Sequence, residues 1–176
     1  MRTAWIVVAG ASLLTAALAA EQAGQRNRVS PHENVSQTVE GATITITYGR
    51  PSMRGRTIFG ALVPYDRVWC PGADEATTLE SNKPLRIGAL RVPPGPHTIW
   101  MLPTANAWTL IVSKEPSGFH TRYNERADLG RVPLRVRALD APVEQLTFSI
   151  APASGGGVIA MTWAQTEVST PFAVVQ

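Results

Sequence analysis

The sequence predicts an all-β protein: an antiparallel β-sandwich of about ten strands, with a long ordered loop at residues 49–75 that caps one end. Three observations lead to this prediction. Apolar and polar residues alternate with a period of two over much of the chain, which is typical of half-buried strands. Short runs rich in Pro and Gly separate these segments at intervals near ten residues. Helical spacing of apolar residues is almost absent, and the best helical candidate is one or two turns at residues 57–62.

The N-terminal residues 1–20 have the pattern of a secretory signal peptide. Arg2 precedes an apolar run from Ala4 to Ala20, and Ala17-Leu18-Ala19 supplies a small-x-small cleavage site. A retained membrane anchor is the alternative, because the run is close to the minimum length for a span. The run is rich in Ala and Gly and lacks a basic flank, which favours cleavage near Ala19 or Ala20. We therefore expect a secreted or periplasmic protein without stable membrane insertion.

The remaining chain is expected to form one domain. Residues 21–34 are polar and aperiodic, which predicts a flexible tail, and residues 35–176 are predicted to form a single β-sandwich. Cys70 is the only cysteine, so no intramolecular disulfide can form and the apolar core must hold the fold. Its place between Trp69 and Pro71 favours a buried, unreactive thiol over a nucleophile.

The strands are predicted in order along the chain. In "TITITYG", Ile44, Ile46 and Tyr48 fall on one face and three threonines on the other, and Gly41 before them predicts a hairpin at residues 35–48. The strand candidates that follow are residues 76–81, 84–92, 97–102, 108–113, 134–139, 145–150, 157–163 and 172–176. The tryptophans within them, which we expect in the core, are Trp100, Trp108 and Trp163.

Residues 49–75, "GRPSMRGRTIFGALVPYDRVWCPGADE", break the strand pattern. This segment is too long for a turn and too apolar for a disordered linker. The apolar residues expected to dock it are Ile58, Phe59, Leu62, Val63, Tyr65, Val68 and Trp69. Its arginines allow two interpretations. Pairs of Arg50 with Glu75, or of Arg56 with Asp74, would clasp the loop to the next strand. Unpaired guanidinium groups would instead bind a carboxylate, a phosphate or a sugar acid.

Charge and spacing exclude several classes of function. The net charge of +3 falls to +2 once Arg2 is removed with the signal peptide. This charge is too small for electrostatic binding to nucleic acid. His32, His97 and His120 are far apart and lack metal-ligand spacing, so we predict neither a metal nor another cofactor. The sequence also contains no nucleophile motif, and Ser52 is not part of a nucleophile elbow.

The leading functional prediction is an extracytoplasmic, non-catalytic protein that binds a small polar ligand or an envelope partner. The candidate ligand-binding residues are Arg50, Arg56, Tyr65, Trp69, Asp74, Glu75 and His97. A secreted hydrolase is the first alternative, with Glu75 or Asp74 as general base and Arg50 and Arg56 stabilising an anion. A purely structural envelope protein is the second alternative.

The same segment resembles a known family. The match is carried by Arg50-Pro51-Ser52, Gly55-Arg56, Ile58-Phe59-Gly60, Val63-Pro64-Tyr65, Val68-Trp69, Gly72-Ala73 and Glu75-Ala76-Thr77. The later segments "PPGPHTIWMLP", "WTLIVSK", "YNERADLGRVPLRV" and "PVEQLTFSI" continue it. In these residues the chain resembles the bacterial domain-of-unknown-function 2911 family. The resemblance implies an exported β-protein and supplies no chemistry. Cys70 and Asp74 depart from it, because the family commonly has a basic residue and Asn there.

Export is tested by the N-terminus of the mature protein. Because the small-residue site ends the apolar run, protein recovered from an envelope fraction should begin at Ala20 or Glu21. Intact-mass analysis measures this directly. Full-length chain recovered from the cytosol would contradict the prediction.

Overall fold

The structure, a computed structural model, describes residues 29–175 and confirms the all-β class. Its strands are β1 (His32–Val39), β2 (Ala42–Gly49), β3 (Thr78–Ser81), β4 (Leu85–Ile87), β5 (Leu90–Val92), β6 (Gly95–Pro103), β7 (Trp108–Ser113), β8 (Asp128–Ala153) and β9 (Gly156–Val174). Within the described range the single helix is a 3₁₀ turn, η1 (Glu125–Ala127), and no helix there is long and apolar enough to cross a membrane.

The described residues include part of the predicted tail and the predicted helical turn, but none of the predicted signal peptide. The predicted signal peptide and residues 21–28 of the predicted tail lie outside the described residues. Strand β1 begins at His32, so residues 32–34 belong to the sheet rather than to the tail.

Residues 57–62 form hydrogen-bonded turns and not a helix: Val63 N donates to Ile58 O at 2.9 Å, and Leu62 N to Thr57 O at 3.3 Å.

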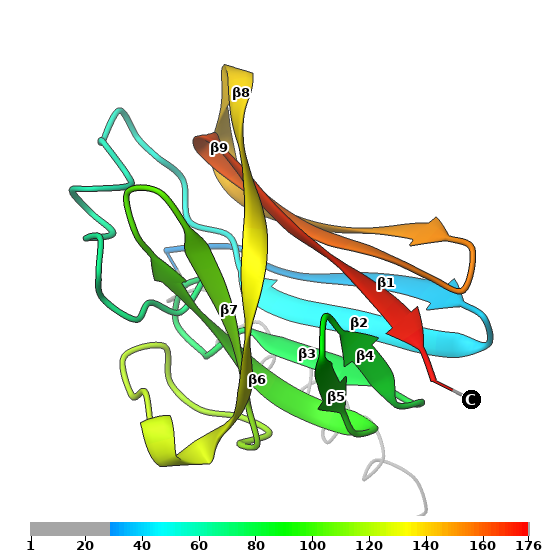
Figure 1. Cartoon of the computed structure of the whole chain (residues 1–176). Coiled ribbons are helices and arrows are strands. Elements are labelled where there is room, and N and C mark those ends of the chain that lie inside the picture. The colour runs from blue at the N-terminus through cyan, green and yellow to red at the C-terminus, as the bar shows by residue number, and fades with distance from the viewer. Residues whose placement is uncertain (1–28, 176) are drawn as a thin grey trace, which may run out of the picture.

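The nine strands form one antiparallel sheet in the order β1-β2-β3-β6-β7-β8-β9-β4-β5 (Figure 1). The predicted sandwich of about ten strands is not confirmed. Segments 134–139 and 145–150, which we expected to be separate strands, are both parts of β8. Pro142 lies between them at a register shift of the β8–β9 ladder, because a strand can accommodate Pro at a bulge as well as at a turn. Segments 157–163 and 172–176 likewise share β9 for most of their length.

The sheet curves so that strands far apart in its order share one core (Figure 1). Strands β2 and β8 are separated by three strands, yet the rings of Tyr48 and Phe148 meet edge to face with centroids 4.9 Å apart. The Phe148 amide also donates to the Tyr48 hydroxyl at 3.1 Å. The predicted hairpin is present, and its turn residues Glu40 and Gly41 both have positive φ, as a two-residue hairpin turn requires.

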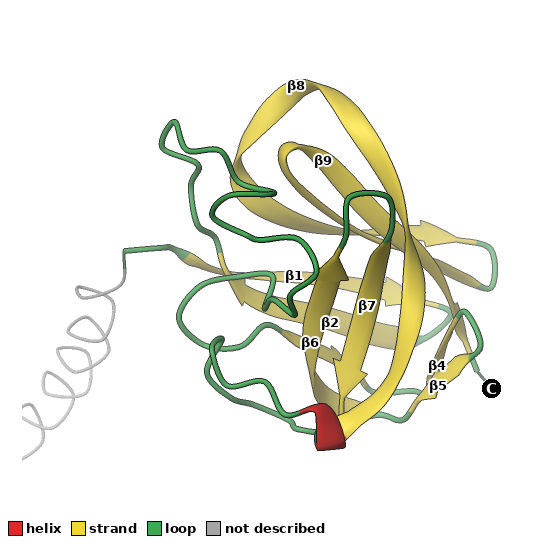
Figure 2. Ribbon diagram, turned by 60° about the vertical axis from the view of Figure 1, so that its left-hand side comes forward, coloured by secondary structure: helices red, strands yellow, loops and turns green. Residues whose placement is uncertain are grey.

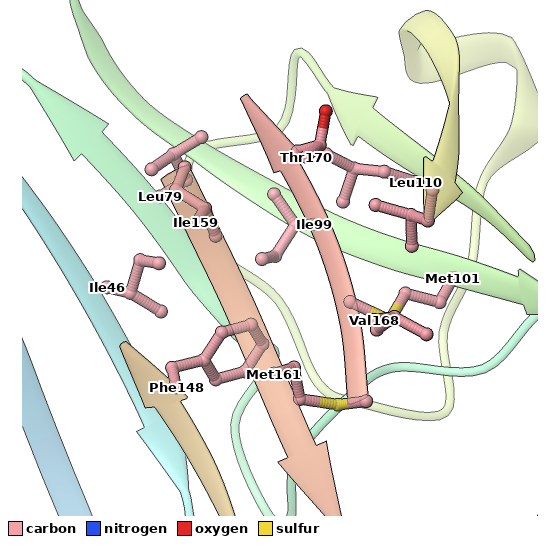
Figure 3. A pocket seen from close by; sticks show the side chains of 11 residues that line it. Ile46, Leu79, Ile99, Met101, Leu110, Phe148, Ile159, Met161, Val168 and Thr170 are labelled. Carbon is pink, nitrogen blue, oxygen red and sulfur yellow. The ribbon is translucent and has the colours of Figure 1, made fainter. Parts of the chain in front are cut away.

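The space inside this curve is filled by apolar side chains. Ile44, Ile46 and Tyr48 are buried, as their alternation with threonines predicts. In the close view, side chains from β2, β3, β6, β7, β8 and β9 point toward one another (Figure 3). The cavity that they leave is about 10 Å³, which is room for about one water molecule. This interior space is too small for a ligand larger than water.

A second apolar cluster covers the other face of β6 and β7. It consists of Cys70, Ala76, Trp100 and Ile111, with Tyr123 packed against it. The rings of Trp100 and Tyr123 lie 5.2 Å apart. Strands β6 and β7 are thus buried on both faces, and the three tryptophans expected in the core are all buried.

Residues 50–77 connect β2 to β3 as one long, loop-like segment on one side of the molecule (Figure 2). Its backbone pairs with the edge of β6 that the four-residue strand β3 leaves open. Ile99 N donates to Thr77 O at 2.9 Å, and Trp69 and Met101 exchange two hydrogen bonds of 2.8 Å. Asp66 N completes the edge with a bond of 2.8 Å to Pro103 O.

The start of the same segment pairs with a free edge of β8. Met53 N donates to Glu144 O at 2.8 Å, and Leu146 N donates to Pro51 O at 3.0 Å. Residues 50–77 therefore act in place of a strand at two edges of the sheet. Such pairing satisfies backbone groups that would otherwise be costly to bury.

Candidate functional site

Phe59 anchors the middle of the loop to the sheet. Its ring meets those of Trp108, Trp69 and Trp163 edge to face, with centroids 4.8, 6.0 and 6.1 Å apart. Trp69 in turn stacks on Trp163 at 6.0 Å. Edge-to-face and stacked pairs of this kind each contribute about 0.5–1.5 kcal/mol beyond the area they bury. The turn that follows Arg56 is consequently held rigidly against β7 and β9.

Opposite this turn, the β8–β9 ladder opens at a bulge. The pairing passes from Ala138–Thr166 to Val143–Ala164, so that four residues of β8, 139–142, lie opposite Gln165 alone. Ala164 has φ of 52°, in the left-handed region that is uncommon for residues other than glycine. Backbone strain of this kind is often concentrated at functional sites.

The loop and the bulge enclose a surface cleft of about 530 Å³, which we call the loop–bulge cleft. Clefts of about 300–1,000 Å³ are typical for small-molecule ligands. The side chains that give it its chemical character are Arg56, Thr57, Phe59, Tyr65, Gln165 and Thr166. Two of the predicted ligand-binding residues, Arg56 and Tyr65, are therefore brought together here.

Arg56 is exposed, but its guanidinium group is fixed in orientation. Nε donates to the carbonyl oxygen of Met53 at 2.9 Å, and Nη2 to that of Ser52 at 2.7 Å. Throughout residues 29–175, no carboxylate forms an ion pair with Arg56. The cleft thus contains an oriented positive charge that no acidic side chain of the described residues neutralises.

Tyr65 forms another part of the cleft wall and is 39% exposed. Its ring lies against the backbone of Gly60, where an added Cβ would be 3.0 Å from the ring. Gly60 has φ of 85°, so glycine meets both the space and the conformation required there. Tyr65 was expected to dock the loop and was also a candidate ligand-binding residue; its ring packs on Gly60 and leaves part of its surface exposed in the cleft.

Arg50 serves the fold rather than the cleft. Its Nη1 lies 2.6 Å from Glu33 Oε2 in β1, while Nε donates to Leu146 O at 3.2 Å and Nη2 to Thr147 Oγ1 at 2.9 Å in β8. The predicted pairs of Arg50 with Glu75 and of Arg56 with Asp74 are wrong. A loop clasp does exist, but the acidic partner comes from β1, because Glu33 lies opposite Tyr48 in the β1–β2 register.

Asp74 and Glu75 lie beside His32. Nε2 of His32 is 2.9 Å from Glu75 Oε2 and 3.7 Å from Asp74 Oδ2. The register sets this proximity: His32 pairs with Gly49, and a Cβ on Gly49 would be 2.3 Å from Ala73 O, so the end of the loop packs directly on that glycine. Sequence analysis missed His32, since it fell within the segment expected to be a tail.

The other histidines are held by backbone groups. His97 is buried, with Nδ1 2.9 Å from Ser113 O and Nε2 3.1 Å from Pro93 O, and it does not line the loop–bulge cleft. His120 Nδ1 contacts Asp74 O. In the part of the chain that the structure covers, no group of three or more His, Cys, Asp or Glu residues is placed to hold a metal ion.

Cys70 is 1% exposed, so its predicted burial is confirmed. Burial raises the pKa of its thiol to about 11, and the Thr77 amide, which donates to Sγ at 3.3 Å, offsets only part of that effect. The thiol is accordingly protonated at neutral pH. Its low reactivity remains a prediction.

The Arg50 contacts predict a measurable contribution to stability. Arg50→Met should lower the free energy of unfolding by about 1–2 kcal/mol, because the arginine side chain is only 25% exposed. The substitution leaves the Leu146 carbonyl oxygen and the Glu33 carboxylate without the partner that Arg50 provides. For a domain of this size the melting temperature should fall by about 2–8 °C. Glu33→Gln should cost less, since the Glu33 side chain is 41% exposed.

Arg54→Met is the matched control for this measurement. Arg54 lies in the same loop and is exposed, and the bond it makes to Glu144 uses its backbone amide rather than its side chain. Its loss should change stability by no more than about 0.5 kcal/mol. Equal melting temperatures for the Arg50 and Arg54 variants would show that the clasp does not stabilise the fold.

Comparison with known proteins places the chain in a family. The sequence profile described as "Protein of unknown function (DUF2911)" matches residues 30–172, which include every strand except the last two residues of β9. Neither the curated proteins nor the solved structures contain a significant match. The matched region covers most of the sequence, including the loop and both walls of the cleft, and the chain belongs to the DUF2911 family.

Proposed function

We propose that this protein is an exported, non-catalytic binding protein that holds a small polar ligand in the loop–bulge cleft. The observation that carries the proposal is the guanidinium group of Arg56, which is oriented in a cleft of about 530 Å³ and has no acidic partner among residues 29–175. A stabilising role would normally pair such a charge, as happens at Arg50. An arginine that is fixed but unpaired is suited to an external anion.

The walls of the cleft support binding because they are set before a ligand arrives. Phe59 fixes the loop side through its contacts with three tryptophans, and the bulge at Gln165 fixes the strand side. A preformed site avoids much of the entropy cost of ordering side chains on binding. The strained backbone at Ala164 lies in the same cleft.

Export is supported by the sequence. The first 20 residues have the n-region, apolar region and small-residue exit of a signal peptide. A single cysteine that is buried is compatible with an oxidising compartment, where an exposed free thiol is a liability. The binding site accordingly lies outside the cytoplasm.

The alternatives have weaker support. Glu75 contacts a histidine, which is the kind of pair that acid–base chemistry uses. The arginines that the hydrolase hypothesis requires, however, are divided between the Glu33 clasp and the cleft. A purely structural role does not explain why Arg56 is held in the cleft without an acidic partner among the described residues. We therefore favour binding over both.

The proposal is tested by blocking the cleft irrespective of ligand charge. A panel of neutral sugars, sugar acids, sugar phosphates, dicarboxylates and amino acids is titrated into ¹⁵N-labelled protein, and amide shifts are mapped. Shifts should cluster at Thr57, Gln165 and Thr166, and Thr57→Trp, which places a bulky ring at the cleft wall, should greatly weaken or abolish them. Ser169→Trp, in the separate groove beside Gly88, is the matched control and should leave them unchanged.

Three results would contradict the proposal. One is a set of shifts centred on another face of the protein. The second is binding that survives Thr57→Trp unchanged, since the bulky ring takes up part of the space that a ligand in the cleft would need. A panel that produces no shifts at the cleft would also count against a small-ligand function.

A further inference from the structure

We infer that the ligand of the loop–bulge cleft is a sugar acid: a hydroxyl-rich molecule with one carboxylate, which binds the outer edge of the Arg56 guanidinium. This inference rests on the proposed function and deepens it by naming the ligand class. Three features of the cleft lead to it: the free edge of Arg56, the charge of the lining, and the unused polar side chains around it.

The hydrogen bonds of Arg56 determine which of its edges is available. A guanidinium group has five N–H donors in one plane. Nε and Nη2 are used on the side edge, by the carbonyl oxygens of Met53 and Ser52. The remaining donors are on Nη1 and the second N–H of Nη2, which form the end edge. Two of these N–H groups run parallel and match the two oxygens of a carboxylate in a bidentate pair.

The charge of the lining favours a carboxylate over a phosphate. Arg56 is the one charged side chain among the described residues that line the cleft. A carboxylate carries one negative charge and is balanced by one arginine. A phosphate monoester carries about 1.5–2 negative charges at neutral pH and would retain an uncompensated part.

The neutral polar groups indicate the rest of the ligand. Thr57, Tyr65, Gln165 and Thr166 line the cleft, and within residues 29–175 their side chains make no hydrogen bond to the protein. Their hydroxyl and amide groups can donate and accept, as ligand hydroxyls require. The partly exposed aromatic ring of Tyr65 offers an apolar surface against which the C–H face of a sugar ring can stack.

Calorimetric titration with three probes tests the inference. Glucuronate should bind the wild-type protein about ten- to a hundredfold more tightly than glucose, because only glucuronate can form the charge-assisted pair. Arg56→Met should bring glucuronate down to the affinity of glucose and leave glucose unchanged, which also shows that the variant is folded. Arg56→Lys keeps the charge but lacks the paired donors, so it should recover only part of the loss.

The third probe and a control variant show whether the carboxylate assignment, the sugar-acid inference or the proposed function is wrong. Glucose 6-phosphate should bind more weakly than glucuronate, and equal or tighter binding would overturn the carboxylate assignment. Arg91→Met, in β5 and outside the cleft, makes the same change in net charge and should have no effect. Equal affinities for glucose and glucuronate, or no binding of any probe, would overturn the inference. The proposed function would still stand if other panel members shift the cleft amides.

Discussion

The structure depends on how the backbone groups at two strand edges are satisfied. Strand β3 has four residues and leaves the edge of β6 unpaired from Ile99 to Pro103, while β8 has a free edge near residues 144–146. Residues 50–77 hydrogen-bond to both edges without forming a regular strand. A buried backbone group left without a partner costs about 1–3 kcal/mol, so several lost at once would consume much of a typical domain's stability.

This constraint also creates the candidate site. Because the segment is fixed at Met53 and again at Trp69, the turn between them is held above the bulge in β8 and β9. The cleft is the space that remains between these two rigid parts. Arg50 and Arg56 lie six residues apart but have different partners. Glu33 neutralises Arg50, whereas Arg56 donates to backbone carbonyl oxygens and keeps its charge available for a ligand.

The sequence predicted what depends on local pattern. Period-two alternation identified the β1–β2 hairpin and at least part of each later strand, although the one candidate at residues 84–92 is two strands, β4 and β5. The apolar residues Ile58 and Val63 are buried as expected. Features that depend on register were not predictable. The partnership of Arg50 with Glu33 follows from strand pairing, and the exposure of Gln165 follows from a bulge whose Pro142 resembled an ordinary turn signal.

The central claim, that residues 50–77 act as a strand at two edges, is tested most directly by native-state hydrogen exchange. The amides of Met53, Trp69, Met101 and Leu146 should exchange about as slowly as those of the β6–β7 ladder, because each donates to a backbone carbonyl across the junction. Fast exchange at Met53 and Trp69, with the ladder still protected, would show instead that the segment is only a surface loop.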